Sequence, residues 1–212
     1  MNICIEGNIG SGKSTLLKLI NSKKDFFISQ LQRNHNLPIK ILTFPEPTLE
    51  WQYLLTEFYN SYKQNTYFYL QNIIYATLYK REKLIQSEIQ NNSNYFVYTF
   101  SERNFLSAEK FFINNETNMD YKLLKEIGNL YKKHFTAIDY SYLFLDSSPE
   151  TCFKRITNRD ENISIEYIKS ISDKYKKYFN EYPPNYYLYT DNNNINYVDY
   201  ILEILNSIPP SY

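Results

Sequence analysis

The sequence has few cysteines, and their arrangement excludes a disulfide framework. Cys4 and Cys152 are the only two among 212 residues, and they show no CxxC or other paired spacing. Small disulfide-stabilised proteins carry many closely spaced cysteines instead. We therefore expect two buried free thiols and a reducing compartment.

Excess charge of one sign and long apolar runs are also missing. Lys plus Arg and Asp plus Glu both number 23, so the formal net charge is zero. A chain without a basic field is not expected to bind nucleic acid or an anionic membrane, although a small anionic ligand stays possible. No apolar run is long enough to span a bilayer, and a strand candidate begins at residue 2, which leaves no room for a signal peptide. We expect a cytoplasmic protein.

Glycine is scarce too, with four in the whole chain, yet three of them fall within residues 7–14. This stretch, Gly-Asn-Ile-Gly-Ser-Gly-Lys-Ser, fits the G-x-x-x-x-G-K-[ST] phosphate-binding pattern at every fixed position. Gly7, Gly10 and Gly12 permit backbone conformations in which successive N–H groups converge on a phosphate. We refer to residues 7–14 as the phosphate loop.

Two side chains and the flanking elements complete the motif. Lys13 adds a mobile positive charge, and the hydroxyl of Ser14 can bind a Mg²⁺ ion that bridges the terminal phosphates. A buried strand is predicted over 2–6 and a helix over 14–20, whose positive end favours the same anion. The motif therefore predicts that a nucleotide triphosphate and its metal ion bind at the end of the first strand.

Strand and helix candidates alternate along the rest of the chain, which is too short for two ordinary α/β domains. The alternation predicts an α/β fold in one domain over 1–212: a five-stranded parallel sheet with helices on both faces, and a ligand site beyond the carboxyl ends of the strands. Strands are predicted at 2–6, 39–44, 95–100, 140–146 and 186–190, and helices at 14–20, 48–63, 66–90, 105–113, 119–135, 163–181 and 195–207, with one more starting at about 149.

Charged residues follow several of the predicted strands. Glu46 stands between two prolines after the second strand, Glu102 and Arg103 end the third, and Asp191 ends the fifth. The carboxyl ends of parallel strands share one crevice, so we expect these residues to meet the phosphate loop there. Together they supply what phosphoryl transfer needs: a base for the acceptor hydroxyl, a metal ligand and a cation for the developing charge.

Each of these residues has an alternative role that the sequence leaves open. Glu46 could cap the following helix instead of acting as a base. Glu102 and Arg103 could form a simple exposed ion pair. Arg155 and Arg159, one helical turn apart, could close over a triphosphate or belong to a solvated basic face.

The motifs occur in an order that resembles a known family, the deoxynucleoside kinases. The matching parts are residues 5–15 (Ile-Glu-Gly-Asn-Ile-Gly-Ser-Gly-Lys-Ser-Thr), Pro-Glu-Pro at 45–47 followed by Trp51, Glu-Arg-Asn at 102–104, and Arg155-x-x-x-Arg159. The Gly-Asn-Ile form of the loop and the position of the tryptophan are the most specific of these. The resemblance covers nearly the whole chain and implies a P-loop kinase fold with a short lid at about 155–163, ATP as phosphoryl donor and Mg²⁺ as cofactor.

The resemblance also implies roles for individual residues. Glu46 would be the general base for the nucleoside 5′-hydroxyl, Ser14 and Glu102 would hold Mg²⁺, and Arg103 would guide the 5′-oxygen and the phosphate. The implied catalytic residues are Lys13, Glu46, Arg103, Arg155 and Arg159, of which the last two form the lid. The implied ATP-binding residues are Gly7, Asn8, Ile9, Gly10, Ser11, Gly12, Lys13, Ser14, Thr15, Arg155, Arg159 and Asp191.

A nucleoside pocket follows from the same resemblance. Gln71 matches the glutamine that reads the base edge through two hydrogen bonds. Trp51 and Phe112 match the aromatic residues that enclose the base, and Tyr59 and Glu161 match the pair that holds the 3′-hydroxyl.

Three further positions of the pocket bear on the choice of base. Ile74, Leu78 and Ala108 are small or apolar, as in the thymidine-accepting and insect multisubstrate branches, whereas the deoxycytidine-kinase branch has an arginine and an aspartate at two of these sites. The implied substrate is therefore a pyrimidine deoxynucleoside, thymidine included. The resemblance further implies a homodimer formed through the helices around 50–90 and 119–135.

Two other functions stay open. A kinase of the thymidylate kinase type would share the loop, a Glu-Pro after the second strand and an acidic-Arg pair after the third. Against it, Phe44 and Pro45 occupy the place where an arginine would grip an acceptor phosphate. The second alternative is a noncatalytic ATP-binding module. Such a module has no need for the combination of a base, a metal ligand and a lid, so the presence of candidates for all three argues against it.

Overall fold

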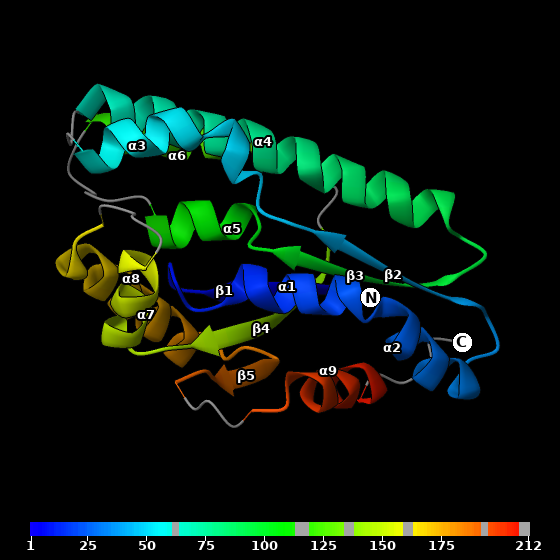
Figure 1. Ribbon diagram of the computed structural model, residues 1–212. Coiled ribbons are helices and arrows are strands. Elements are labelled where there is room, and N and C mark those ends of the chain that lie inside the picture. The colour runs from blue at the N-terminus through cyan, green and yellow to red at the C-terminus, as the bar shows by residue number, and fades with distance from the viewer. Residues whose placement is uncertain (61–63, 113–118, 134–137, 159–162, 192–194, 208–212) are drawn as a thin grey trace.

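The computed structural model describes residues 1–60, 64–112, 119–133, 138–158, 163–191 and 195–207 (Figure 1). Over these ranges the strands form one five-stranded sheet in the order β2-β3-β1-β4-β5, and every neighbouring pair is parallel. The fold class predicted from the alternation of strands and helices is thus confirmed. The strands are β1 (Asn2–Gly7), β2 (Ile39–Phe44), β3 (Phe96–Glu102), β4 (Tyr140–Asp146) and β5 (Tyr186–Tyr189).

One face of the sheet is covered by α1 (Lys13–Ser22), α2 (Lys24–Leu31) and α9 (Tyr197–Asn206), whose buried residues share one core with the strands. In Figure 1, α1 crosses the middle of the sheet, and α2 and α9 lie towards the lower right. Alternate strand residues such as Ile3 and Ile5 point into this layer, as the period of two requires. Helix α2 was not predicted, because the segment from 22 to 38 is mostly polar. Its apolar stripe consists of little more than Phe27 and Leu31, four residues apart, yet both side chains are fully buried.

The opposite face carries an aromatic core. Phe144 of β4 packs against Tyr175 and Phe179 of α8 (Ile165–Glu181), and Phe111 stacks on Tyr175 with ring centroids 3.8 Å apart. Phe111 belongs to a π-helical turn, η3 (Ala108–Phe112), which follows the short helix α5 (Phe105–Ser107). One continuous helix was predicted over 105–113; the structure divides it in two, and π-turns of this kind are frequent at functional sites.

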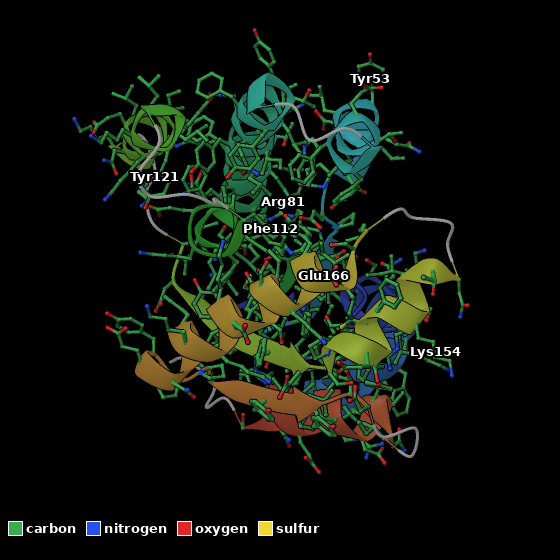
Figure 2. All side chains as sticks on the ribbon, turned by 90° about the vertical axis from the view of Figure 1, so that its left-hand side faces the viewer. Tyr53, Arg81, Phe112, Tyr121, Lys154 and Glu166 are labelled. Carbon is green, nitrogen blue, oxygen red and sulfur yellow. The ribbon has the colours of Figure 1, made fainter. Side chains whose placement is uncertain are left out.

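A group of helices rises beyond the edge of the sheet formed by β2 and β3. Helices α3 (Gln52–Asn60), α4 (Gln64–Asn91) and α6 (Met119–Lys133) lie side by side there (Figures 1 and 2). Their shared core includes Trp51, Leu70, Ile74, Leu78 and Phe105. The predicted helix over 48–63 begins as a 3₁₀ turn, Thr48–Glu50, before α3.

The remaining elements are the 3₁₀ turn Gln32–Asn34 and α7 (Pro149–Thr157), whose N-terminus is capped by the Ser148 side chain accepting from the Thr151 N–H. None of the described helices is both long and apolar enough to cross a lipid bilayer. Cys4 and Cys152 are both buried free thiols, as predicted.

Candidate active site

The phosphate loop joins β1 to α1 at the carboxyl edge of the sheet. Lys13 folds back over the loop and donates its Nζ to the carbonyls of Gly7 at 2.9 Å and Asn8 at 2.7 Å. Gly10 has φ +80, and a Cβ placed on it would lie 2.6 Å from the carbonyl oxygen of Cys152. Only glycine satisfies both the backbone angle and the contact with α7, so the loop and α7 are packed as one unit.

Lys13 is the central charge of the loop. Its pKa is lowered to about 8, first because the side chain is buried and second because Arg103 lies nearby; Glu102 and Glu46 oppose the shift. A buried ammonium group with a depressed pKa gains most from an added anion, because the anion restores the charge balance that burial removed. The loop is therefore electrostatically prepared for a polyphosphate.

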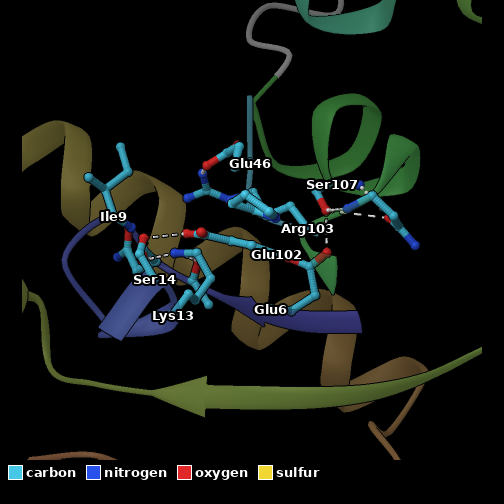
Figure 3. Close-up of polar contacts among 12 residues, drawn as sticks. Glu6, Ile9, Lys13, Ser14, Glu46, Glu102, Arg103 and Ser107 are labelled. Atoms are coloured by element: carbon cyan, nitrogen blue, oxygen red, sulfur yellow. Dashed lines mark hydrogen bonds and ion pairs between the residues drawn. The ribbon is translucent and has the colours of Figure 1, made fainter. Parts of the chain in front are cut away.

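Ser14 and Glu102 meet across the site. The Ser14 hydroxyl, at the start of α1, donates to Oε1 of Glu102, at the end of β3, over 2.8 Å (Figure 3). Both are oxygen ligands, and they lie beside the phosphate loop. Mg²⁺ prefers oxygen ligands and commonly takes one or two protein groups plus phosphate oxygens, so this pair fits the ion that the motif implies.

Glu46 and Arg103 meet at the ends of the neighbouring strands β2 and β3. Arg103 Nη1 donates to Glu46 Oε2 at 2.5 Å (Figure 3). The Arg103 guanidinium also lies 4.5 Å from the ring centre of Phe112. Burial alone would lower the pKa of Arg103, but the charge of Glu46 raises it well above its ordinary value. The exposed ion pair considered for Glu102 and Arg103 is not observed; Arg103 pairs with Glu46 instead.

The residues predicted to enclose the base come from α4, the π-turn and the segment that contains Trp51. Gln71 is 3% exposed, and its Oε1 has no hydrogen-bond partner in the described part of the chain. Trp51 is held by a hydrogen bond from its indole Nε1 to Thr77 Oγ1 at 2.7 Å. An acceptor buried without a partner is costly, so the Gln71 amide is suited to a ligand that supplies a donor.

The other predicted pocket residues fall in the same region. Ile74, Leu78 and Ala108 are buried in the core that contains Trp51. Phe112 is fixed through its carbonyl, which accepts from the Tyr67 hydroxyl at 3.1 Å. Tyr59 packs against Tyr167 of α8 with ring centroids 6.3 Å apart.

The chain matches the family model for deoxynucleoside kinases over residues 3–208. It belongs to the deoxynucleoside kinase family. Membership of this family makes the chain a phosphotransferase and accounts for a phosphate loop and strand-end carboxylates at one sheet edge.

Solved structures support the P-loop kinase fold of this deoxynucleoside kinase. A structure of deoxyadenosine kinase from M. mycoides with the products dCMP and a flexible dCDP bound superposes with a TM-score of 0.72 at 20% identity, covering 99% of this chain and 100% of that one. A second structure of the M. mycoides enzyme, with bound dCTP, gives 0.72 at 22% identity and covers 98% and 100%. No significant match is found among curated proteins.

A cavity of about 490 Å³ lies on the other side of the phosphate loop from Glu46. Arg155 lines it and donates Nη2 to the carbonyl of Thr190 at 2.9 Å, so α7 is joined to the end of β5. The lining residues are Ser11, Gly12, Thr15, Leu16, Leu19, Leu145, Arg155, Asn158, Thr190 and Tyr197. The cavity thus extends the phosphate loop between α1 and α9.

Some residues predicted to bind ATP or the nucleoside neither line this cavity nor lie beside Glu46. The carboxylate of Asp191 accepts from the backbone N–H of Ser148 at 3.1 Å and from the Tyr189 hydroxyl at 3.0 Å, and it does not line the cavity. Ile9 packs toward α7 and α8. Arg159 and Glu161 lie outside the described residues.

Glu6 was part of the quoted motif, but no role was predicted for it. Its buried carboxylate accepts a hydrogen bond from the Ser107 hydroxyl (Figure 3). It accepts another from the Tyr175 hydroxyl at 2.9 Å. Burial raises the pKa of Glu6, and the Ser107 hydrogen bond and the Arg103 charge partly offset the rise. The available signal was a carboxylate at the end of an otherwise apolar buried strand.

Arg81 was also missed. It lies on the buried face of α4, and its guanidinium donates to the carbonyls of Pro45, Glu102 and Arg103. The sequence signal was an arginine in helical register with the apolar residues Leu78 and Ile85, where a solvated cation is not expected.

Proposed function

We propose that the chain transfers the terminal phosphoryl group of ATP to the 5′-hydroxyl of a deoxyribonucleoside and so forms the 5′-monophosphate. The observation that carries this proposal is the Glu46–Arg103 pair at 2.5 Å, located at the same sheet edge as the phosphate loop. Phosphoryl transfer needs a positioned acceptor and charge neutralisation more than covalent chemistry from the protein. The pair supplies both beside a loop suited to the donor.

In this proposal each charged group has one task. Glu46 accepts the proton of the 5′-hydroxyl as that oxygen attacks, and Arg103 holds the Glu46 carboxylate and the incoming oxygen in place. Lys13 neutralises charge on the donor phosphates, with Arg155 approaching from α7. Arg159 is proposed to join Arg155 in the lid.

Ser14 and Glu102 are the residues that we propose to hold Mg²⁺. The separation of 2.8 Å between their oxygens and the lack of any nitrogen or sulfur donor in the pair suit this hard cation. When bound, the ion would neutralise charge on the terminal phosphates and fix their geometry.

The nucleoside is proposed to lie with its base against Gln71, between Trp51 and Phe112. The Gln71 amide can donate once and accept once toward a base edge, and its unpartnered Oε1 is consistent with that use. Ile74, Leu78 and Ala108 are uncharged and belong to an apolar core. We propose that they accept the methyl group of thymine as well as the unmethylated ring of cytosine. Tyr59 and Glu161 are proposed to hold the 3′-hydroxyl.

The base and ribose of ATP are proposed to occupy the cavity of about 490 Å³ beside Arg155. Its volume falls in the range typical of small-molecule sites, and it combines apolar walls from Leu16, Leu19 and Tyr197 with the polar groups of Asn158 and Thr190.

A homodimer is proposed to form through α4 and α6. Large apolar side chains are exposed on both helices, Tyr69, Ile73 and Leu84 on α4 and Leu123 and Leu130 on α6. Exposed apolar residues gathered on neighbouring helices are typical of an association surface. Sedimentation velocity should give twice the chain mass of 25.5 kDa, and a monomer at micromolar concentration would contradict this.

The proposed function is tested by a substrate panel with ATP and Mg²⁺: the four common deoxynucleosides, and thymidine monophosphate as the competing acceptor. We expect the highest kcat/KM for thymidine and deoxycytidine. Higher kcat/KM for a purine would overturn the pyrimidine preference, and this arm matters because the similar M. mycoides structures are of a deoxyadenosine kinase. Turnover of the monophosphate alone would favour the thymidylate kinase type, and ATP binding without any turnover would favour a binding module.

A further inference from the structure

We propose that Arg81 is a positioning residue for the transfer reaction: it fixes the carboxyl ends of β2 and β3 relative to each other and thereby aligns Glu46 with Arg103. The inference rests on the proposed function, because it assigns Arg81 to the geometry of that same site. Arg81 belongs to α4, and its side chain points from the group of helices α3, α4 and α6 towards the sheet (Figure 2).

Three carbonyl groups from two strand ends converge on this one guanidinium. Nη1 donates to Glu102 O at 2.8 Å and to Pro45 O at 3.2 Å, and Nη2 donates to Arg103 O at 2.6 Å. Pro45 immediately precedes Glu46, and the other two carbonyls belong to the pair that ends β3. Arg81 therefore bonds directly to the backbone that carries the base, the metal ligand and the phosphate-guiding cation.

These contacts join the two strand ends where their own ladder stops. The β2–β3 pairing ends at Phe44 opposite Ser101, so nothing in that ladder holds Pro45 against Glu102. On its other side β3 stays bonded to β1, where Glu102 pairs with Ile5 and the Arg103 N–H donates to Ile5 O at 3.0 Å. Arg103 follows with φ +57, in the left-handed region that a residue with a side chain rarely adopts. A conformation of this kind persists only when surrounding contacts enforce it, and Arg81 supplies a bond to its carbonyl.

The Arg81 side chain is buried and is not part of a solvated surface. The side chain is 7% exposed, and its two Nη atoms donate to those three carbonyls, whereas its buried Nε has no hydrogen-bond partner among the described residues. A planar guanidinium presents several donors in fixed directions, whereas an ammonium group cannot reach carbonyls from two chain segments with the same geometry. Filling space between α4 and the sheet would require only an apolar side chain, so the arginine serves the strand ends.

The experiment compares Arg81→Met, Arg81→Lys and Arg81→Ala with two controls on the same helix. Ile85→Ala removes a fully buried side chain one turn away, and Lys83→Met removes an equal charge from the exposed face. Initial rates give kcat and the KM for ATP and for the preferred deoxynucleoside, and thermal unfolding reports stability. Arg81→Ala is also assayed with added methylguanidinium, at concentrations far below those that unfold the wild-type protein.

Arg81→Met should lose on the order of 10²-fold in kcat, the usual effect of a small misplacement of reacting groups. The KM for ATP should change much less, because the phosphate loop and Ser14 come from β1 and α1, and only Glu102 among the residues proposed for ATP and Mg²⁺ is bonded to Arg81. Arg81→Lys should fall between Met and the wild type, and methylguanidinium should restore part of the kcat of Arg81→Ala. Ile85→Ala should lower thermal stability without lowering kcat, and Lys83→Met should change neither. Chemical rescue separates positioning from a general loss of structure.

The inference is overturned if Arg81→Met retains the kcat of the wild type. It is also overturned if Arg81→Met and Ile85→Ala lose the same stability and the same kcat, and methylguanidinium does not raise the kcat of Arg81→Ala. If Arg81→Met does not fold, Arg81→Lys decides the question by the same criteria. A wild-type protein that phosphorylates no deoxynucleoside would instead remove the proposed function on which the inference rests.

Discussion

Arg103 occupies one oxygen of the Glu46 carboxylate, Oε2, at 2.5 Å. The two residues follow strands that are neighbours in the sheet, and the Arg103 guanidinium is in turn covered by the ring of Phe112 at 4.5 Å. The carboxylate is thus fixed on one side, while its second oxygen, Oε1, is the atom that we propose to accept the 5′-hydroxyl proton.

Replacing Glu46 by Gln should leave binding intact and slow the reaction. The amide can still accept from Arg103 but cannot take a proton, so kcat should fall by about 10²-fold or more, the usual contribution of a positioned base. Initial rates and calorimetric titration with ATP and the nucleoside test this. Glu50→Gln, four residues on and exposed, is the matched control; equal kcat in both variants would remove Glu46 from the role of base.

Replacing Thr77 by Val should weaken the pocket wall formed by Trp51. The substitution keeps the shape of the side chain but leaves the buried indole N–H, now bonded at 2.7 Å, without an acceptor. An unsatisfied buried donor costs about 1–3 kcal/mol, which urea unfolding should detect. The KM for the nucleoside should rise while the KM for ATP does not.

Thr56→Val is the control for this variant, because within the described ranges the exposed Thr56 hydroxyl bonds to no more than the backbone carbonyl of Gln52 on α3. If both valine variants lose the same stability, the Trp51–Thr77 bond has no special importance.

Replacing Gly10 by Ala should impair ATP binding more than replacing Gly12. Both glycines have positive φ, but the new Cβ at position 10 would lie 2.6 Å from Cys152 O, whereas at position 12 it meets no atom within 4 Å. The first variant must move α7 away from the loop; the second carries backbone strain alone. Calorimetry should rank ATP affinity as wild type, then Gly12→Ala, then Gly10→Ala.

Gly128→Ala, within α6, provides the reference for this series. Its Cβ would make only ordinary contacts with Tyr75, and a helical Gly→Ala change stabilises by about 0.5–1 kcal/mol. ATP affinity that is equal in the Gly10 and Gly12 variants would show that contact with α7 does not matter.

The buried Glu6 should make stability depend on pH in a direction opposite to that of a paired surface carboxylate. Its pKa in the folded protein is raised above the ordinary value of 4.5, first by burial, so the folded state holds the proton more tightly than the unfolded state. The free energy of unfolding should therefore fall as pH rises from about 4.5 through the folded-state pKa. Urea unfolding of wild type and Glu6→Gln across this range should show the wild type losing stability relative to the variant; a constant difference would contradict the shift.

The parts of the site that the sequence predicted are those with local patterns. The phosphate loop is a contiguous motif between a strand and a helix, and Glu46, Glu102 and Arg103 follow apolar runs whose ends are easy to find. The topology of a parallel sheet then determines that they meet. Ser14 and Glu102, both assigned to Mg²⁺ from the sequence, lie within hydrogen-bond distance of each other. The pairing of Arg103 with Glu46 was not predicted, and no local pattern indicates the left-handed backbone at Arg103.

What could not be predicted depends on contacts between distant segments. Arg81 is 21 residues from Glu102, and Glu6 is 101 residues from Ser107 and 169 from Tyr175, so nothing near either residue in the chain shows its partners. The π-turn over 108–112 likewise depends on packing against α8, because its residues alone are compatible with an ordinary helix.

The strand order divides the site into two parts of different construction. The described residues that we propose to contact the nucleoside, and Arg81 behind them, all come from one uninterrupted stretch, residues 46–112. Those proposed for ATP come from opposite ends of the chain, from β1 and α1 on one side and from α7, β5 and α9 on the other. Acceptor choice is therefore concentrated in one stretch of the sequence. A chimera that carries a relative's residues 46–112 should take on that relative's acceptor preference, and of the residues proposed for ATP and Mg²⁺ it would exchange only Glu102.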